Sequence, residues 1–391
     1  MWIYLIVFLI PLLFFFADNK ENRSNSTFLF VFFLLLSLLV GGSDMLGGYD
    51  RYIYGEVFDS AADNVTSRMP FATFFTGWGF AEKGYMFYNW LLAHFTENRY
   101  IFILITTLLI YVFLYFSFYR HMKSYTYALL LFLGLWFFFT FTYLREVVAV
   151  AISSLAITYV IKRDFVKFIL VVLIACSFHH SALILLPVYF LPIKKWSPRT
   201  IIFFMILCLI MGLTGSPSVM FEAYCSLMGD EEKFAGYAEE MKTYGTRTDY
   251  LIEASFFIGY IVSQYRFIAK EKAELVYLNY ALVFCAILLL FIQSPQAGRL
   301  TWYYMIGLIA FFSCLSVKKS IKPIWKNGLL VVCFFLFFRI LYSWGIYLYP
   351  YKTFLTDGYR DNDNIRKTYE YNYNYDEDKF CRKAFRFTLN L

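Results

Sequence analysis

Charged residues are scarce in this chain. Only 16% of its 391 residues are Asp, Glu, Lys or Arg, and 60% are hydrophobic. A soluble domain of this length carries about a quarter of its residues charged. Apolar runs of roughly 17–20 residues recur along the sequence, a length that crosses the hydrocarbon core of a membrane as a helix. The composition therefore excludes an ordinary soluble domain and predicts an all-α polytopic membrane protein.

Paired cysteine motifs and a signal peptide are also missing. The seven cysteines lack CxxC spacing, and five fall inside apolar runs, which indicates small core residues rather than a metal or redox site. Residues 2–16 have no preceding basic region and no convincing cleavage site, so we expect a retained helix. The net charge of +7 says little about nucleic acid, because the basic residues sit in short turns between apolar segments, as the positive-inside rule predicts.

The apolar segments predict about twelve membrane-spanning helices, some of them short or broken. Their ranges are 2–16, 27–46, 100–119, 126–143, 147–161, 165–178, 181–191, 200–213, 251–268, 275–292, 300–317 and 328–349. Six turns between them hold about half of the 35 lysines and arginines. The positive-inside rule places these turns in the cytoplasm, which puts both termini outside. Residues 84–95 are too few to cross the membrane and are expected to lie in its outer interface.

Two long polar stretches remain on the predicted outer side, residues 41–99 and 214–250, and both contain an excess of acidic residues in their polar parts. We expect residues 1–349 to form a single transmembrane domain and residues 350–391 to form a polar tail. The second stretch is expected to hold a short helix or two. The alternating tyrosines at 369–375 fit either a strand edge or disorder.

Polar side chains gather on the predicted outer face. They are Asp50, Arg51, Glu82, Tyr85, Arg145, Glu146, His179, His180, Arg299 and Tyr303. Arg145 and Arg299 are lone cations in short outer turns, against the charge bias of a membrane protein. A phosphate or pyrophosphate would compensate them, because the guanidinium fork matches phosphate oxygens with two parallel hydrogen bonds. The alternative is an ion pair with Glu82, Glu146 or the acidic stretches.

The two adjacent histidines, His179 and His180, have several possible roles. Either could act as a base, bind phosphate or fill a helix end. A metal site is disfavoured, because no third ligand sits at helical spacing. Asp50 and Glu82 are single carboxylates, which are either catalytic or simply solvated.

Four short motifs carry a resemblance to a known family. They are Tyr49-Asp50-Arg51-Tyr52, Glu82-Lys83-Gly84-Tyr85 with Asn89, Leu144-Arg145-Glu146 with Ala149, and Phe178-His179-His180-Ser181-Ala182. In this order, with apolar runs between them, they resemble the EpsG family of exopolysaccharide membrane proteins, which is akin to the Wzy-type polymerases of O-antigen and capsule synthesis. Arg299 with Tyr303, later in the chain, is a weaker match to the family pattern. The family pattern has Arg-Gln where this chain has Arg145-Glu146, and its histidine aligns with His180.

The resemblance implies a metal-independent membrane glycosyltransferase that needs no cofactor and has a GT-C-like fold. Such proteins join oligosaccharide repeats carried on undecaprenyl pyrophosphate at the outer face of the bacterial inner membrane. The implied catalytic residues are His180, Glu82 and Asp50, and the implied pyrophosphate ligands are Arg145 and Arg299. Weaker glycan or lipid contacts are expected from Arg51, Tyr85, His179 and Tyr303. The expected partners are the lipid-linked glycan, the bilayer, a chain-length regulator and a flippase, but no nucleic acid.

Other functions stay open at this point. A flippase or transporter of lipid-linked oligosaccharides would need two similar halves for alternating access, and the chain shows no internal repeat. An O-acetyltransferase would also use histidine but needs a cytoplasmic route for its acyl donor. A polysaccharide ligase is the closest alternative, since it would act on the same donor.

Overall fold

The computed structural model describes residues 1–17, 25–78, 82–215, 245–294, 296–356 and 382–386. Within these residues every regular element is a helix, apart from one isolated bridge between Ser43 and Thr353. The chain divides into two compact units. Unit 1 comprises residues 1–156, 166–183 and 323–391, and unit 2 comprises residues 157–165 and 184–322.

Every predicted apolar segment contains helix. Among the described residues, five helices are long and apolar enough to cross a membrane: Arg99–His121, Leu144–Lys162, Lys272–Leu290, Ala297–Ser316 and Pro323–Ser343. Shorter apolar helices are Trp2–Phe16, Ser26–Gly41, Tyr125–Leu135, Phe165–Phe178, His180–Phe190 and Pro198–Leu213. The chain is therefore a helical membrane protein. The number of spans and the GT-C-like fold stay predictions.

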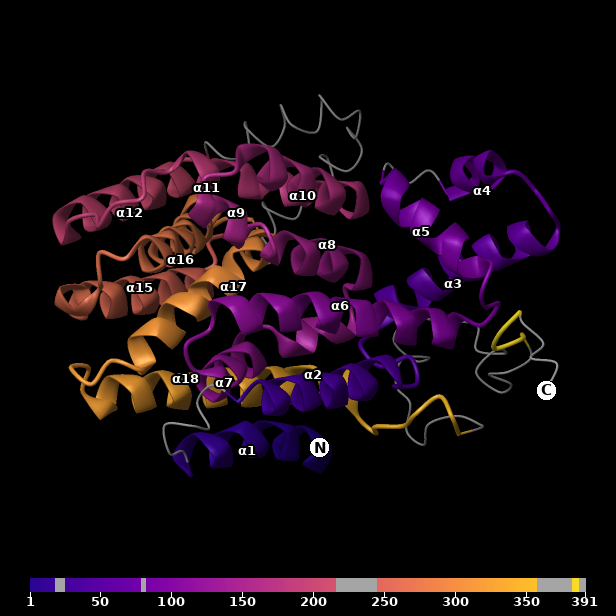
Figure 1. Cartoon of the computed structure of the whole chain (residues 1–391), viewed down its shortest axis with the longest axis horizontal. Helices are drawn as coiled ribbons and strands as arrows, with labels where there is room; N and C mark the ends of the chain where they lie inside the picture. Colours follow the sequence, from indigo (N-terminus) through magenta and orange to yellow (C-terminus); the bar gives the residue numbers. More distant parts are fainter. Residues whose placement is uncertain (18–24, 79–81, 216–244, 295, 357–381, 387–391) are drawn as a thin grey trace. The chain divides into compact units, whose positions relative to one another are not determined.

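Unit 1 is a bundle of helices that run side by side (Figure 1). Its members are α1 (Trp2–Phe16), α2 (Ser26–Gly41), α6 (Arg99–His121), α7 (Tyr125–Leu135), α8 (Leu144–Ser154) and α18 (Pro323–Ser343), followed by the short α19 (Gly345–Leu348). Every residue of α7 is buried, because this helix packs against both α1 and α18. The Tyr4 hydroxyl donates to the Leu348 carbonyl at 2.8 Å, so the start of α1 lies beside the end of α19.

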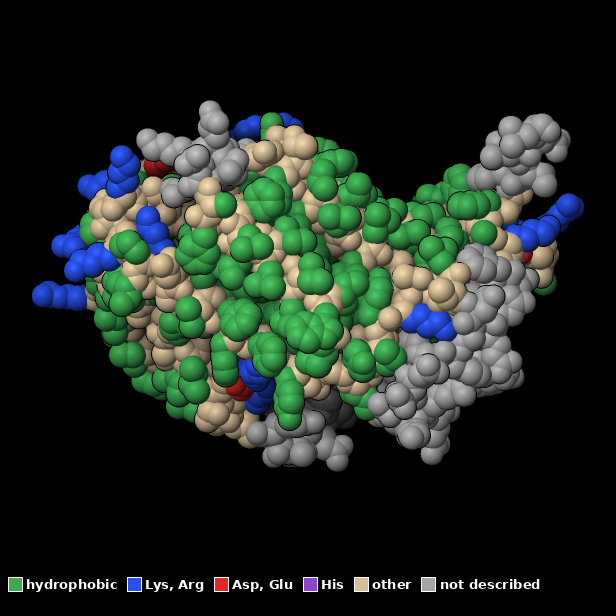
Figure 2. All heavy atoms as spheres, turned by 90° about the horizontal axis from the view of Figure 1, so that it is seen from below, with side chains coloured by type: hydrophobic (Ala, Val, Ile, Leu, Met, Phe, Trp, Pro, Cys, Tyr) green, Lys and Arg blue, Asp and Glu red, His purple; other side chains and the backbone are tan. Residues whose placement is uncertain are grey.

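Large apolar side chains point outward from α1, α2 and α18. Those more than half exposed are Trp2, Ile6, Leu13, Phe16, Phe30, Leu35, Ile324, Val331, Phe335 and Tyr342. Figure 2 shows hydrophobic side chains over the broad middle of one face, with lysines and arginines at its left margin. Water-exposed apolar patches of such extent are rare in soluble monomers, so this surface suits contact with lipid.

Unit 2 is organised around α16 (Lys272–Leu290), which is buried on most of its circumference. It packs against α9 (Ile157–Lys162), α11 (Leu186–Phe190), α12 (Pro198–Leu213), α15 (Thr248–Ser263) and α17 (Ala297–Ser316); the 3₁₀ turn η4 (Tyr265–Phe267) follows α15. Lys318 pairs with Glu274, and Lys195 donates to the Ile268 carbonyl at 2.7 Å. The ammonium groups of these lysines therefore donate hydrogen bonds to a backbone carbonyl and to a carboxylate near the helix ends of this unit.

Several predicted boundaries are wrong, each for a local reason. The helix predicted to reach residue 46 ends at Gly41, because residues 42–48 bond elsewhere; the Asp44 N–H, for example, donates to the Lys352 carbonyl at 2.8 Å. The segment 126–143 is not one helix, since the 3₁₀ turn η2 (Phe137–Phe141) follows α7. Arg145 and Arg299 lie in the first turns of α8 and α17 rather than in connecting turns.

The predicted outer stretch 41–99 folds into three helices of unit 1: α3 (Tyr49–Thr66), α4 (Phe71–Trp78) and α5 (Lys83–Ala93) (Figure 1). With 11 residues, α5 is too short to span the membrane, at about 1.5 Å of rise per residue. Helix α10 (Phe165–Phe178) ends just before the histidine pair, and the 3₁₀ turn η3 (His180–Leu185) begins at its second member. The predictions for residues 216–244 and for the tyrosines at 369–375 fall outside the described residues.

Candidate functional site

The second and third motifs meet in unit 1. Glu82 stands at the N-cap position of α5, and Arg145 is in the first turn of α8. Arg145 Nη1 lies 3.1 Å from Glu82 Oε2, and the two side chains are 15% and 6% exposed. The ring of Tyr85, which is fully buried, has its centroid 6.0 Å from the Arg145 guanidinium carbon. A carboxylate and an aromatic ring therefore hold this guanidinium, because both attract a cation.

The fourth motif joins the same end of unit 1. The Ser181 hydroxyl donates to Glu146 Oε1 at 3.4 Å, and His179 Nδ1 lies 2.5 Å from Ser181 Oγ. Glu146 follows Arg145 in the first turn of α8 and is only 2% exposed. We call Glu82, Tyr85, Arg145, Glu146, His179 and Ser181 the motif cluster.

Gly84 explains how α5 comes so close to the end of α10. A Cβ atom at Gly84 would lie 2.2 Å from Ser177 Oγ and 2.8 Å from the Ser177 carbonyl oxygen. Next to this contact, the rings of Tyr88 and Phe178 lie 5.7 Å apart. Only glycine fits here without moving a backbone, so the glycine of the second motif places Glu82 and Tyr85 beside the histidine turn.

The hydroxyl of Tyr85 stays neutral inside the motif cluster. Burial raises the pKa of its hydroxyl, because the protein interior disfavours the phenolate. Asn89, one turn further along α5, is also fully buried and donates from Nδ2 to the Tyr85 carbonyl at 2.8 Å. The predicted contact of Tyr85 with glycan or lipid stays a prediction.

The first motif forms a structural joint. Arg51 is fully buried and donates to the carbonyls of Phe141 and Val40, each at 2.7 Å. Burial lowers the pKa of Arg51 to about 10, which leaves it charged at neutral pH. Gly47 is beside it at φ +115°, and a Cβ there would lie 2.4 Å from the Phe141 oxygen. Arg51 therefore joins α2, α3 and η2, and its predicted glycan contact stays a prediction.

The remaining predicted residues are placed as follows. Asp50 is half-buried in the first turn of α3. His180 begins η3 and makes no side-chain hydrogen bond or ion pair with any described residue. Arg299 and Tyr303 belong to unit 2, on α17, where Arg299 Nη1 donates to Gln296 Oε1 at 3.2 Å.

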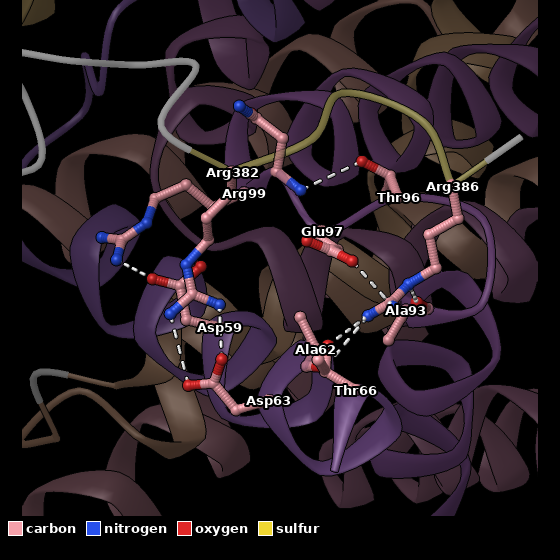
Figure 3. A network of polar contacts seen from close by, with 11 residues as sticks. Asp59, Ala62, Asp63, Thr66, Ala93, Thr96, Glu97, Arg99, Arg382 and Arg386 are labelled. Carbon is pink, nitrogen blue, oxygen red and sulfur yellow. Dashed lines mark hydrogen bonds and ion pairs between the residues drawn. The ribbon is translucent and has the colours of Figure 1, made fainter. Parts of the chain in front are cut away.

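Sequence reasoning missed a segment near the C-terminus that binds α3 and α5. Figure 3 shows Arg386 against Ala62, Thr66, Ala93 and Glu97. Its guanidinium donates to the Ala93 carbonyl at 2.6 Å, to the Ala62 carbonyl at 3.0 Å and to Thr66 Oγ1 at 2.9 Å. It also pairs with Glu97 at 2.8 Å.

The same segment makes two further kinds of contact. Arg382 bonds both oxygens of Asp63, at 2.8 and 3.2 Å (Figure 3). The Glu97 N–H donates to the Lys383 carbonyl, and the Arg386 N–H donates to the Phe95 carbonyl. We call residues 382–386 the C-terminal strap. The basic residues at its ends, opposite an acidic stretch, were the one sequence signal for it.

Comparison with known proteins supports the resemblance. The EpsG family model matches residues 26–353, which is most of the chain and includes all four motifs. No curated protein and no solved structure matches the chain. Among the described residues, no group of three or more His, Cys, Asp or Glu is arranged to hold a metal ion.

Proposed function

Because the chain belongs to the EpsG family, a family of Wzy-like polysaccharide polymerases, we propose that it polymerises oligosaccharide repeats linked to undecaprenyl pyrophosphate. The reaction takes place at the outer face of the bacterial inner membrane, next to a flippase and a chain-length regulator. The growing chain is the glycosyl donor and one lipid-linked repeat is the acceptor. The observation that carries this proposal is the motif cluster, to which three distant segments contribute an arginine paired with Glu82 and a histidine linked through Ser181 to Glu146.

The chemistry requires a cation at the leaving group. A hydroxyl of the acceptor sugar attacks the anomeric carbon of the donor, and the bond from that carbon to the lipid pyrophosphate breaks. Negative charge develops on the pyrophosphate, and fixed hydrogen-bond donors stabilise it. Arg145 presents such donors in a planar fork, and Glu82, 3.1 Å from Nη1, orients that fork. In unit 2, Arg299 with Tyr303 is a separate proposed contact to phosphate and lipid.

The attacking hydroxyl must also lose its proton. His180, Glu82 and Asp50 are the acceptors that the sequence predicts, by general base catalysis. Glu82 already faces Arg145, so its first role in this proposal is to orient the guanidinium. No step requires a metal ion or a cofactor in this scheme.

Glycan length in a strain that lacks the gene tests the proposal. We expect long polymer to disappear while single repeats persist at the cell surface or on lipid, and a plasmid copy should restore the polymer. Loss of every repeat from the outer side would instead indicate a flippase. Polymer of normal length that accumulates on its lipid carrier would indicate a ligase.

A further inference from the structure

We propose that Glu146, Ser181 and His179 form a hydrogen-bonded relay in which His179 is the base of the polymerase reaction and Glu146 is its positioning residue. This inference deepens the proposed function and rests on it. It assigns roles to Glu146 and Ser181, and it moves the base from His180 to its neighbour. The relay lies wholly within unit 1.

The relay starts from a buried acid. Glu146 is 2% exposed and stands in the first turn of α8, where the unpaired N–H groups of a helix favour a negative charge. Its Oε1 accepts from the Ser181 hydroxyl at 3.4 Å. A buried carboxylate needs such donors, because burial removes the hydrogen bonds that water would donate to it. Ser181 therefore connects Glu146 to the histidine turn.

The direction of the hydrogen bonds decides which nitrogen of His179 accepts a proton. An ionised carboxylate can only accept, so the Ser181 proton points to Glu146 and its oxygen accepts from His179 Nδ1, 2.5 Å away. The Ser181 backbone N–H competes for Nδ1 at 3.4 Å. The contact with Glu146 has the same length but is charge-assisted, and therefore dominates. Nδ1 then carries the proton, and Nε2 is the nitrogen that receives one from the acceptor hydroxyl.

The same bonds stabilise the product of that proton transfer. When Nε2 takes up a proton, the ring becomes a cation, and its charge reaches Glu146 through Ser181. The arrangement follows the logic by which a buried acid orients a catalytic histidine and stabilises its protonated form. His180 has no comparable support, since it makes no side-chain hydrogen bond or ion pair with any described residue.

The test measures polymerisation by the full-length protein in liposomes, with purified lipid-linked repeat as substrate, across roughly pH 5–9. For the wild type, the rate should fall at acid pH as His179 becomes protonated. His179→Gln should lower the rate about 100- to 10,000-fold, the usual contribution of a general base. His180→Gln should have a much smaller effect.

The positioning role of Glu146 has its own signature. Removing the charge of Glu146 makes the His179 cation less stable, so the pKa of His179 should fall. In Glu146→Gln and in Ser181→Ala, the acid limb of the rate profile should therefore move to lower pH, with a lower maximal rate. The double variant should be no slower than the slower single variant, because both changes break one relay. A merely structural loss would lower the rate equally at every pH.

Two control variants keep the test specific. Ser177→Ala removes a hydroxyl that, among the described residues, donates only to the Ile174 carbonyl on α10. His94→Gln changes an exposed histidine at the end of α5. Both should keep the wild-type rate and acid limb. A larger loss in His180→Gln than in His179→Gln, or an unmoved acid limb in Glu146→Gln, overturns the relay. A wild-type protein that makes no polymer would instead refute the proposed function.

Discussion

At the scale of single residues, the guanidinium groups of two arginines in unit 1 have different roles. Arg51 is fully buried against the carbonyls of Val40 and Phe141, so its donors serve to join segments of the fold. Arg145 keeps 15% of its side chain exposed and is oriented by Glu82 and Tyr85. An oriented and accessible fork suits phosphate, whereas an enclosed one has no room for a ligand.

Replacing Arg145 by lysine separates these roles. Arg145→Lys keeps the charge but loses the two-pronged fork, and we expect polymer synthesis to fall about 100- to 1,000-fold at a normal protein level. Arg51→Lys is the structural comparison, because one ammonium group cannot bond both carbonyls in the same geometry. It should lower the amount of folded protein, with normal chain lengths from what remains. Glycan profiles and immunoblots of membranes measure both quantities.

The same measurement applies to Arg299, for which Arg299→Lys should match Arg145→Lys. Near-normal glycan length with Arg145→Lys, together with a low protein level of Arg145→Ala, would contradict the phosphate contact. The ion pair of Arg145 with Glu82 would then serve stability alone.

At the scale of elements, the helices α3 and α5 depend on contacts from distant parts of the chain. Asp59 of α3 pairs with Arg99 at the start of α6 (Figure 3). The C-terminal strap adds Arg386, which bonds carbonyls of α3 and α5. Single short helices are marginal in water, so contacts of this kind are what fixes their position.

The two arginines of the C-terminal strap should differ in their effect on stability. Arg386→Ala leaves the carbonyls of Ala62 and Ala93 without this donor, which costs about 1–3 kcal/mol for a buried group. Arg382→Ala breaks an ion pair with Asp63, which is 64% exposed, and surface pairs contribute only about 0–1 kcal/mol. Thermal unfolding of the purified protein in detergent measures the difference. Equal midpoints for the two variants would show that Arg386 holds nothing in place.

The elements also show what sequence reasoning can and cannot reach. Period and length of the apolar runs predict α1 and α10 to the residue. The first turns of α8 and α17 are not predicted, because the charged residues Glu146 and Arg299 suggest connecting turns. The first turn of a helix nevertheless tolerates polar residues. The second motif is recognisable in the sequence. Its glycine, Gly84, is required because Ser177 on another helix leaves no room for a Cβ atom. Such tertiary contacts leave no local pattern in the sequence.

At the scale of the whole molecule, contacts in unit 1 restrict the topology. The C-terminal strap bonds Phe95 and Glu97, and we therefore predict that the chain between these two regions crosses the membrane an even number of times. The contact of Tyr4 with Leu348 likewise places the start of α1 with the end of α19. Both constraints agree with the predicted map, in which the termini share one side.

Labelling of single cysteines with a membrane-impermeant thiol reagent tests this map in a cysteine-free background. We expect His94→Cys and Thr356→Cys, both at exposed positions, to react in intact cells. Ser197→Cys and Lys319→Cys, exposed in predicted cytoplasmic turns, should react only after the membrane is opened. Reaction of His94 and Thr356 from opposite sides would contradict the contacts of the C-terminal strap, and labelling of Lys319 in intact cells would reverse the orientation.

The C-terminal strap also sets an order for biosynthesis. A chain leaves the ribosome from its N-terminus, so α3 and α5 are complete long before residue 386 exists. Their final attachment has to wait until residues 382–386 have been synthesised. A nascent protein cut short after α19 would contain every apolar segment yet lack the strap, and a surveillance protease could recognise it by the loosened α3 and α5.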